Sequence, residues 1–283
     1  MKKIVTIQDI SCYGKCSLTV ALPIISAMGI ETSVIPTAVL STHTGGFTGY
    51  TFRDLTDDIM PVSEHWKSLG LEFDAVYTGY LGSVKQVELM SDFFDMFRTE
   101  KNYIIVDPVM GDKGVLYAGF GNDFISGMKK LCGKADIILP NMTETSFMLD
   151  IPYAQAEAEN GNEDFIKSCL VKLTDLGCDT AVITGVQKNG THQGAVAYQK
   201  STDTFASSFR NHINAYVHGT GDVFSSAFSG AVAKGASLQK SLDIAVNFTA
   251  DCIEATLPIP ENYMNGVYFE KCIKNLAEIS ENI

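Results

Sequence analysis

Short apolar runs alternate along the chain with longer segments whose apolar positions recur every three or four residues. The short runs are rich in β-branched residues and predict buried strands at residues 4–7, 32–40, 75–79, 103–106, 137–139 and 180–184. The longer segments predict helices at residues 17–28, 59–69, 83–97, 120–131 and 163–176. This repeated alternation predicts an α/β fold of three layers (α/β/α), in which a mainly parallel central sheet has helices on both faces.

The pattern changes in the second half of the chain. Residues 195–198 and 204–209 predict a hairpin added to the edge of the sheet. From Gly221 onward the pattern is helical to the C-terminus, with breaks near Gly235 and around Pro258 and Pro260. No internal repeat and no linker divides the sequence, so we expect residues 1–283 to form a single domain.

A polar, glycine-rich stretch at residues 41–53 interrupts the regular alternation. It contains Gly45, Gly46 and Gly49, and it follows directly on a predicted strand. Glycine-rich connections that leave the end of a strand commonly cover binding sites. We therefore expect this stretch to form a small mobile flap over the active site.

Composition narrows the class of protein. Hydrophobic residues make up 46% of the chain and charged residues 19%, which suits a large buried core, and no run of 18 apolar residues predicts a membrane span. Gln8 and Asp9 cut the N-terminal apolar run too short for a signal peptide. The seven cysteines include no CxxC pair and are typical of reduced thiols in a cytoplasmic protein. A net charge of −12 argues against nucleic acid as a partner.

The motif with the clearest chemical meaning is His218-Gly219-Thr220-Gly221-Asp222, which opens a run of small residues typical of a buried helix. Main-chain amides at the start of a helix bind anions, and glycines let those amides approach a phosphate. An Asp in the first turn would lie beside that anion site and could take a proton from an alcohol. A glycine turn with an Asp at the helix start also explains the motif without any chemistry.

Polar residues follow every predicted parallel strand. Because ligands of open α/β sheets bind at the carboxyl ends of the strands, these residues form one candidate site. They include Asp9 and Ser11, His43 and Thr44, Tyr80, Asp107, Asn141 and Glu144, and Thr184. Any one of them is also explained as a turn or capping residue.

Three carboxylates of this set, Asp107, Glu144 and Asp222, are expected to converge at the same edge of the sheet. Converging carboxylates repel one another unless a cation lies among them, and Mg²⁺ is the natural candidate. Because Mg²⁺ keeps several waters, Asp107 or Glu144 could act through water. The sequence lacks the GxxxxGK[ST] loop, a GxGxxG after the first strand and the protein-kinase signatures, which disfavours P-loop enzymes, dehydrogenases and protein kinases.

Several segments together resemble the ribokinase-like superfamily, and within it the pyridoxal (vitamin B6) kinases. The GTGD motif and the Asn141-Met142-Thr143-Glu144 segment resemble the superfamily. Three further segments are more specific to the pyridoxal kinases: Ser41-Thr42-His43-Thr44, Thr78-Gly79-Tyr80-Leu81-Gly82-Ser83 and Val106-Asp107-Pro108-Val109-Met110-Gly111-Asp112. The resemblance extends from about Lys3 to about Ala255.

The resemblance implies an ATP-dependent kinase for the 5′-hydroxymethyl group of pyridoxal, pyridoxamine or pyridoxine. It implies that Asp222 is the catalytic base and that Gly219, Thr220 and Gly221 hold the transferred phosphoryl group, with Thr184 near the nucleotide phosphates. Asp107, Asn141 and Glu144 would contact the nucleotide and its Mg²⁺, with Asp107 and Glu144 at the metal. Asp9, Ser11, His43, Thr44 and Tyr80 would hold the pyridine ring. A homodimer is expected on the same ground, and a need for K⁺ stays open.

The sequence departs from the pyridoxal kinases at Asp9, where many members have Ser. An Asp there could accept a hydrogen bond from the ring hydroxyl, pair with a protonated pyridine nitrogen, or shift the preference among vitamers. His218 is also less usual; it would line the nucleotide cleft or be an ordinary surface histidine. A hydroxymethylpyrimidine kinase and a non-catalytic B6-binding protein remain as alternative functions.

Overall fold

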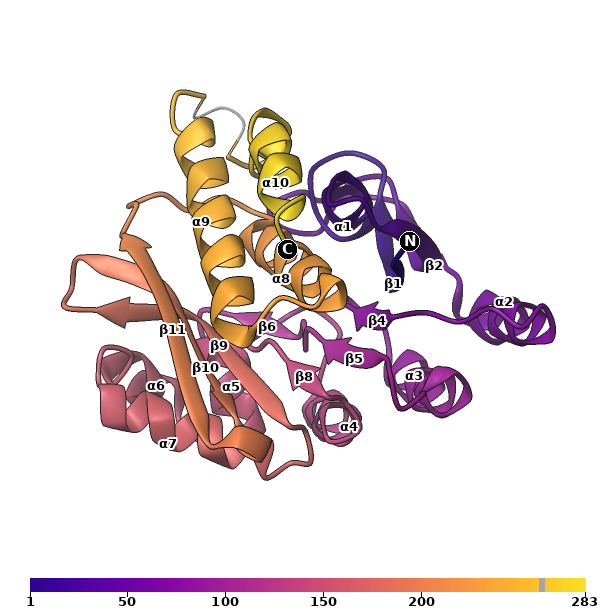
Figure 1. Cartoon of the computed structure of the whole chain (residues 1–283), viewed down its shortest axis with the longest axis horizontal. Helices are drawn as coiled ribbons and strands as arrows, with labels where there is room; N and C mark the ends of the chain where they lie inside the picture. Colours follow the sequence, from indigo (N-terminus) through magenta and orange to yellow (C-terminus); the bar gives the residue numbers. More distant parts are fainter. Residues whose placement is uncertain (260–262) are drawn as a thin grey trace.

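The computed structural model describes residues 1–259 and 263–283, so the predicted break at Pro260 lies outside the described residues. A nine-stranded sheet has the order β11-β10-β9-β8-β5-β4-β1-β2-β3 (Figure 1). Its six inner strands are parallel: β1 (Lys3–Ser11), β2 (Glu31–Leu40), β4 (Ala75–Thr78), β5 (Tyr103–Val106), β8 (Ile137–Ile138) and β9 (Thr180–Lys188). The edge strands are antiparallel: β3 (Phe52–Asp54), β10 (His192–Gln199) and β11 (Thr204–Asn211).

Helices cover both faces of the sheet, which confirms the three-layer α/β fold (Figure 1). One layer contains α1 (Leu18–Ala27), α8 (Thr220–Lys234), α9 (Leu238–Thr256) and α10 (Ile273–Ser280). The other contains α2 (Thr56–Ser68), α3 (Val84–Phe97), α4 (Asn122–Cys132), α5 (Met142–Met148), α6 (Tyr153–Ala158) and α7 (Glu163–Thr174). Two short 3₁₀ turns, η1 (Lys200–Thr202) and η3 (Phe269–Lys271), complete the described helices.

The central strands β4, β5 and β8 are apolar along most of their length because each faces a helical layer on both sides. In β5, Ile105 packs into the core beneath α1, α8 and α9, while Ile104 and Val106 pack into the core beneath α3 and α4. Successive side chains of a strand point to opposite faces, so a continuous apolar run fills two cores. This explains why the sequence pattern predicts these strands correctly.

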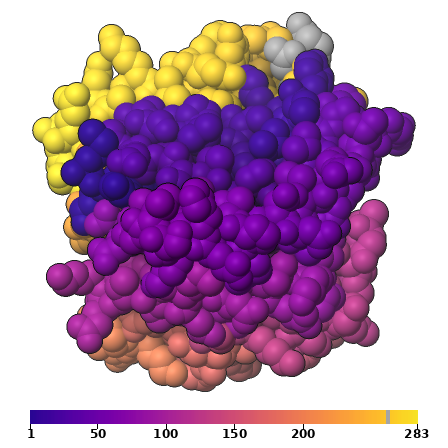
Figure 2. Space-filling view, turned by 90° about the vertical axis from the view of Figure 1, so that its right-hand side faces the viewer, coloured from indigo at the N-terminus to yellow at the C-terminus, as the bar shows by residue number. Residues whose placement is uncertain are grey.

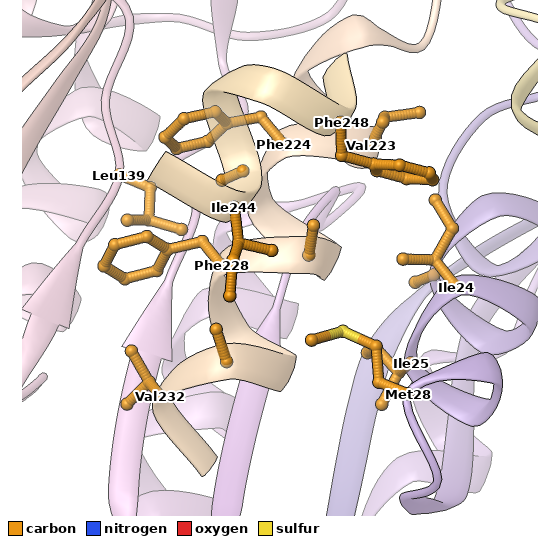
Figure 3. Close-up of a cluster of buried hydrophobic side chains, with 14 of the residues drawn as sticks. Ile24, Ile25, Met28, Leu139, Val223, Phe224, Phe228, Val232, Ile244 and Phe248 are labelled. Atoms are coloured by element: carbon orange, nitrogen blue, oxygen red, sulfur yellow. The ribbon is translucent and has the colours of Figure 1, made fainter. Parts of the chain in front are cut away.

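The run of small residues in α8 allows close packing of helices at the centre of one layer. A Cβ atom added at Gly230 would lie 2.4 Å from the Met28 sulfur of α1. Figure 3 shows Phe224 and Phe228 of α8 pointing toward Leu139 and Ile244, with Met28 and Ile24 of α1 on the other side. The buried α8 therefore has a fixed position, and its N-terminus is held in place by this packing.

The two ends of the chain lie together. Figure 2 shows the C-terminal residues, in yellow, against the N-terminal residues, in indigo, and α10 packs on α1. Elements of two to seven residues were missed by the sequence pattern, because they are too short to show a period: β3, α5, α6, and the two-stranded sheet of β6 (Gly111–Asp112) and β7 (Val115–Leu116).

Candidate active site

A cavity of about 740 Å³ opens at the carboxyl ends of the parallel strands, and every site residue predicted from the sequence lines it. These residues are Asp9, Ser11, His43, Thr44, Tyr80, Asp107, Asn141, Glu144, Thr184, Gly219, Thr220, Gly221 and Asp222. The cavity spans the point where β1 lies between β2 and β4, so that the chain leaves β1 in one direction and later continues in the other. Ligands of open α/β sheets bind at such a point.

The sheet has two register shifts beside the cavity. Both β1 and β9 extend further than the sequence pattern predicted. Asp9 and Ser11 belong to β1 itself, and β2 has an extra residue opposite Asp9. Thr184 lies inside β9, where Gly185, at φ 73°, is an extra residue relative to β10. Bulges of this kind re-aim side chains. They bring Asp9 and Thr184 to the cavity although neither follows the end of its strand.

The start of α8, the predicted anion site, has no side-chain cap. Gly219 precedes the helix at φ 79°, and a Cβ atom there would lie 2.2 Å from the Lys15 carbonyl oxygen. Among residues 1–259 and 263–283, no side chain caps the first-turn amides, which leaves them available to a ligand in the cavity. A Cβ atom at Gly221 would meet nothing within 4 Å. Gly219 is thus the position at which glycine is required.

Asp222 lies in the first turn of α8, where it is partly buried and lines the cavity. Burial raises the pKa of Asp222 to about 7; the Ser17 main-chain N–H donates to it and opposes this shift, and Asp107 and Asp9 add to it. Ser17 has a φ of 53°, a left-handed conformation that is unusual for a residue with a side chain. A carboxylate with a pKa near neutrality suits a general base.

Asp107 and Glu144 are two further buried carboxylates at the same edge. The Ser225 hydroxyl donates to Asp107 at 2.7 Å, and burial raises the pKa of Asp107 to about 7. Glu144 accepts hydrogen bonds from the main-chain N–H groups of Met110 (3.1 Å) and Asn141 (2.8 Å), and burial together with Asp107 raises its pKa. Asn141 and Glu144 form a capping box at the start of α5, which is the structural part of their role.

The buried carboxylates have no cationic partner among the described residues. Asp9, Asp107, Glu144 and Asp222 take part in none of the ion pairs of residues 1–259 and 263–283. No group of three or more His, Cys, Asp or Glu side chains there forms a ready-made metal cage. Uncompensated carboxylates without a complete cage fit a Mg²⁺ ion that keeps most of its waters.

The opposite end of the cavity is built from side chains of three segments. Asp9 accepts a hydrogen bond from the Ser11 hydroxyl at 3.1 Å, and burial raises the pKa of Asp9. Burial and the charge of Asp9 raise the pKa of Tyr80 to about 12. His43 Nε2 lies 2.8 Å from the Met264 carbonyl oxygen, and the Gly45 N–H donates to its Nδ1 at 3.2 Å. His43 is therefore a neutral imidazole with both nitrogens occupied, because burial also lowers its pKa.

The predicted flap at residues 41–53 has a definite arrangement. His43, Thr44, Gly45 and Gly46 line the cavity, whereas the last residues belong to β3 and pair with β2. Its motion stays a prediction. His218 also lines the cavity and lies 5.3 Å from His43 between ring centroids, so it is not an isolated surface histidine.

Several lining residues were missed from the sequence. Lys113 lies in the turn of the β6–β7 hairpin, and Tyr117 directly follows β7. Tyr216 lies in the loop before α8, and Arg210 lies near the end of β11. The signal that could have indicated the hairpin is Asp112-Lys113-Gly114, a sequence typical of a tight turn. It lies shortly after the predicted site residue Asp107, in a loop whose apolar residues show no regular spacing.

An uncapped helix start with an Asp in its first turn and a switch-point cavity fit an ATP-dependent kinase of the ribokinase-like superfamily, and comparison with known proteins shows that the chain is one. The profile of the family described as phosphomethylpyrimidine kinase matches residues 22–266, and the chain belongs to this family. No helix in residues 1–259 and 263–283 has the length and apolar character needed to cross a membrane.

Relatives named for two different activities resemble the chain. A pyridoxine/pyridoxal/pyridoxamine kinase of Bordetella avium is 24% identical, over 89% of this chain and 85% of its own length. A hydroxymethylpyrimidine/phosphomethylpyrimidine kinase of Bacillus subtilis is 28% identical, over 79% of this chain and 78% of its own. Both relatives are kinases, so the reaction class is shared while the acceptor differs.

Two solved structures resemble the chain over nearly all its length. One is from Bacteroides thetaiotaomicron, provisionally named a phosphomethylpyrimidine kinase and crystallised with pyridoxal; it has a TM-score of 0.90 and 38% identity, and covers 97% of this chain and 95% of its own. The other is the pyridoxal kinase of Lactobacillus plantarum, with a TM-score of 0.88, 27% identity, and coverage of 100% and 99%.

Proposed function

We propose that the chain, as a single kinase domain, transfers the γ-phosphoryl group of ATP to the 5′-hydroxymethyl group of pyridoxal, pyridoxamine or pyridoxine. The observation that carries the proposal is Asp222, a partly buried carboxylate whose pKa is raised by burial to about 7, on the first turn of a helix whose first residues line the same cavity. The acceptor alcohol would lie between this carboxylate and the phosphate.

In this proposal the alcohol oxygen attacks the γ-phosphorus, and the bond between that phosphorus and the β–γ bridging oxygen breaks. The alcohol proton passes to Asp222, and ADP leaves with the bridging oxygen. The transition state of such a transfer is loose, so the protein mainly positions the two substrates and stabilises the charge on the phosphoryl oxygens. The amides of Gly219, Thr220 and Gly221 would supply that stabilisation.

Asp107 is the residue that we propose to hold Mg²⁺, directly or through water, with Glu144 beside it. The ion would neutralise charge on the phosphates. Both oxygens of Glu144 already accept main-chain hydrogen bonds, which favours contact through water for Glu144. Thr184 and Asn141 border the same end of the cavity and are proposed to contact the nucleotide phosphates.

The pyridine ring is assigned to the end of the cavity that contains Asp9, Ser11, His43, Thr44 and Tyr80. A B6 vitamer as acceptor is supported by the Bacteroides thetaiotaomicron structure, which is 38% identical and was crystallised with pyridoxal. The Lactobacillus plantarum pyridoxal kinase supports it further. The Leishmania donovani pyridoxal kinase, crystallised with ADP and pyridoxamine, has the same fold at 19% identity.

A second candidate acceptor is hydroxymethylpyrimidine or its phosphate. The family profile that matches residues 22–266 and the Bacillus subtilis relative both favour this alternative. Both candidate rings are small aromatic heterocycles that carry a CH₂OH group. The residues at the nucleotide end would serve either acceptor equally, so only the ring end of the cavity can separate them.

The test is a coupled assay of ADP production with Mg-ATP and a panel of pyridoxal, pyridoxamine, pyridoxine, hydroxymethylpyrimidine and hydroxymethylpyrimidine phosphate. We expect the highest kcat/KM with a B6 vitamer. A higher kcat/KM with either pyrimidine would show that the acceptor is the alternative, hydroxymethylpyrimidine or its phosphate. ADP production at background with all five compounds would indicate a non-catalytic binding protein.

The assembly proposed from the resemblance is a homodimer, and light scattering on the purified protein tests it directly. Dependence of the rate on K⁺ is tested in the same assay by replacing K⁺ with a bulky monovalent cation. Removal of Mg²⁺ with a chelator should abolish turnover, because the buried carboxylates alone would repel the phosphates.

A further inference from the structure

The charges that line the cavity are strongly unbalanced. Its acidic residues are Asp9, Asp107, Asp112, Glu144 and Asp222, whereas only two lining residues of the described chain, Lys113 and Arg210, carry a permanent positive charge. Arg210 already pairs with Asp251 (3.2 Å) and Glu254 (3.3 Å). Lys113 takes part in no ion pair within residues 1–259 and 263–283. It is the cation that remains available to a ligand.

Lys113 occupies a strained position at the tip of the β6–β7 hairpin. Gly111 pairs with Leu116 and Asp112 with Val115, which leaves a turn of two residues, Lys113 and Gly114. Both have positive φ angles, 50° and 79°. Such turns favour Asn-Gly or Gly-Gly, because a side chain in the left-handed region costs free energy. A lysine at this position invites a functional explanation.

The hairpin is held firmly over the cavity by the first turn of α5. The Asn141 side-chain amide donates to the Gly111 carbonyl oxygen at 3.0 Å, and Glu144 accepts from the Met110 N–H. The Gly114 N–H donates to the Thr143 hydroxyl at 3.0 Å. Both the base and the tip of the hairpin are thereby anchored, so the main chain places Lys113 and only its side chain needs to move.

The Lys113 ammonium lies beside the segment that leads into the anion site. Its Nζ is 3.5 Å from the centroid of the Tyr216 ring, and the Tyr216 hydroxyl donates to Asp112 at 3.0 Å. Tyr216 is three residues before Gly219. Burial lowers the pKa of His218, and the charge of Lys113 adds to that shift, which again places the ammonium near the start of α8.

We propose that Lys113 is a phosphate ligand, whose ammonium leaves the ring of Tyr216 and binds the terminal phosphates of the nucleotide when the triphosphate enters the cavity. This inference rests on the proposed function to the extent that ATP binds at the start of α8. A lysine on a flexible stem suits this role, since it can exchange a weak contact with an aromatic face for a charge-assisted hydrogen bond. Lys113 acts by positioning the phosphates opposite Asp222.

The test compares the binding of Mg-ATP, inorganic triphosphate and adenosine, measured by titration calorimetry, to the wild type and three variants. Lys113→Met removes the charge and keeps the length of the side chain, whereas Lys113→Arg keeps the charge. The matched control is Lys188→Met, because Lys188 lies over the Phe209 ring at 4.8 Å but does not line the cavity.

We expect Lys113→Met to weaken the binding of ATP and of triphosphate by about tenfold, the size of one charge-assisted hydrogen bond. Adenosine binding should not change, Lys113→Arg should stay within about threefold of the wild type, and Lys188→Met should bind normally. In turnover assays the KM for ATP should rise while the KM for the acceptor stays the same.

Unchanged binding of ATP and triphosphate to Lys113→Met would overturn the inference. An equal loss for adenosine would also overturn it, since the residue would then act only on the shape of the cavity. If the wild type binds neither ATP nor triphosphate, the proposed function itself fails. If it binds both but phosphorylates none of the ring alcohols, the acceptor is wrong and the role of Lys113 stands.

Discussion

The two ends of the cavity are constructed differently. In the proposed function, the phosphates of the nucleotide meet main-chain amides, those of Gly219, Thr220 and Gly221 at the start of α8. The acceptor end is mostly side chains, among them Asp9 and Tyr80. Main-chain sites recognise what all nucleotide phosphates share, whereas side-chain sites distinguish one ring from another. If the proposed function holds, the main-chain amides serve the reaction class and the side chains at the other end select the acceptor.

The largest loss of activity, and the sharpest test of the contrast between the two ends of the cavity, is expected from a substitution at Asp222. Replacing it with Asn should lower kcat by roughly 10²–10⁴-fold, because the neutral amide cannot accept the alcohol proton. The dissociation constant for Mg-ATP should stay within about twofold, since the amides of the helix start are unchanged. Asp123→Asn is a matched control, because Asp123 also lies in the first turn of a helix, α4, but outside the cavity.

The measurement is steady-state turnover with the best acceptor, together with calorimetric binding of ATP. Turnover of Asp222→Asn within tenfold of the wild type would show that another group takes the proton. A loss of ATP binding as large as the loss of turnover would assign Asp222 to nucleotide binding instead.

The second effect separates the two glycines of the nucleotide end. In Gly219→Ala the added Cβ meets the Lys15 carbonyl oxygen and the φ of 79° becomes strained, so the first-turn amides must shift. We expect kcat/KM for ATP to fall roughly a hundredfold, the size of losing one oxyanion donor. Gly221→Ala should change it by less than about threefold, because its Cβ enters open space. Equal effects would show that the amide geometry of this turn is unimportant.

The same contrast explains what the sequence could and could not predict. Buried strands show as short apolar runs and α8 as a run of small residues, so both could be predicted. Asp107 was located because topology brings all strand ends to one edge, and Asp222 because it follows a Gly-x-Gly pair at a helix start. Lys113 was missed because its position depends on a hydrogen bond that Asn141 donates to Gly111 and one that Thr143 accepts from Gly114, and both residues lie about 30 residues further along the chain. Thr184 was expected at the site as a residue at the end of its strand. It lines the cavity, but it lies inside β9 next to a bulge, and only the register of β9 and β10 reveals that bulge.

A third and smaller effect is expected at Asp9, at the acceptor end. Its carboxylate is buried beside Ser11 with no cationic partner among the described residues, and it would gain one from a protonated pyridine nitrogen. Asp9→Asn should raise the KM for the preferred vitamer by about tenfold, the worth of one charge-assisted hydrogen bond, and leave the KM for ATP unchanged. Asp9→Ser tests the residue that pyridoxal kinases often have at this position. If either variant changes the KM for ATP instead, the two ends of the cavity are not separable.

The smallest effect concerns the cost of burying Asp222 without a cation. Because burial raises the pKa of Asp222 to about 7, the folded protein holds a proton there that the unfolded chain has already lost above its ordinary pKa near 4. The free energy of unfolding therefore falls as pH rises through this window, and the loss is complete above the folded pKa. His43 and His218, whose pKa values are lowered by burial, act in the opposite direction, so the wild type alone is not informative.

The comparison with Asp222→Asn removes these other contributions, because the histidines are present in both proteins. In the absence of Mg²⁺ the variant should melt a few degrees above the wild type at pH 8, and the margin should shrink toward pH 5. Mg²⁺ should reduce the margin at pH 8 by stabilising the wild-type carboxylates through a bound cation. A margin that is the same at both pH values would show that Asp222 is paired in solution and that the nucleotide end does not store uncompensated charge.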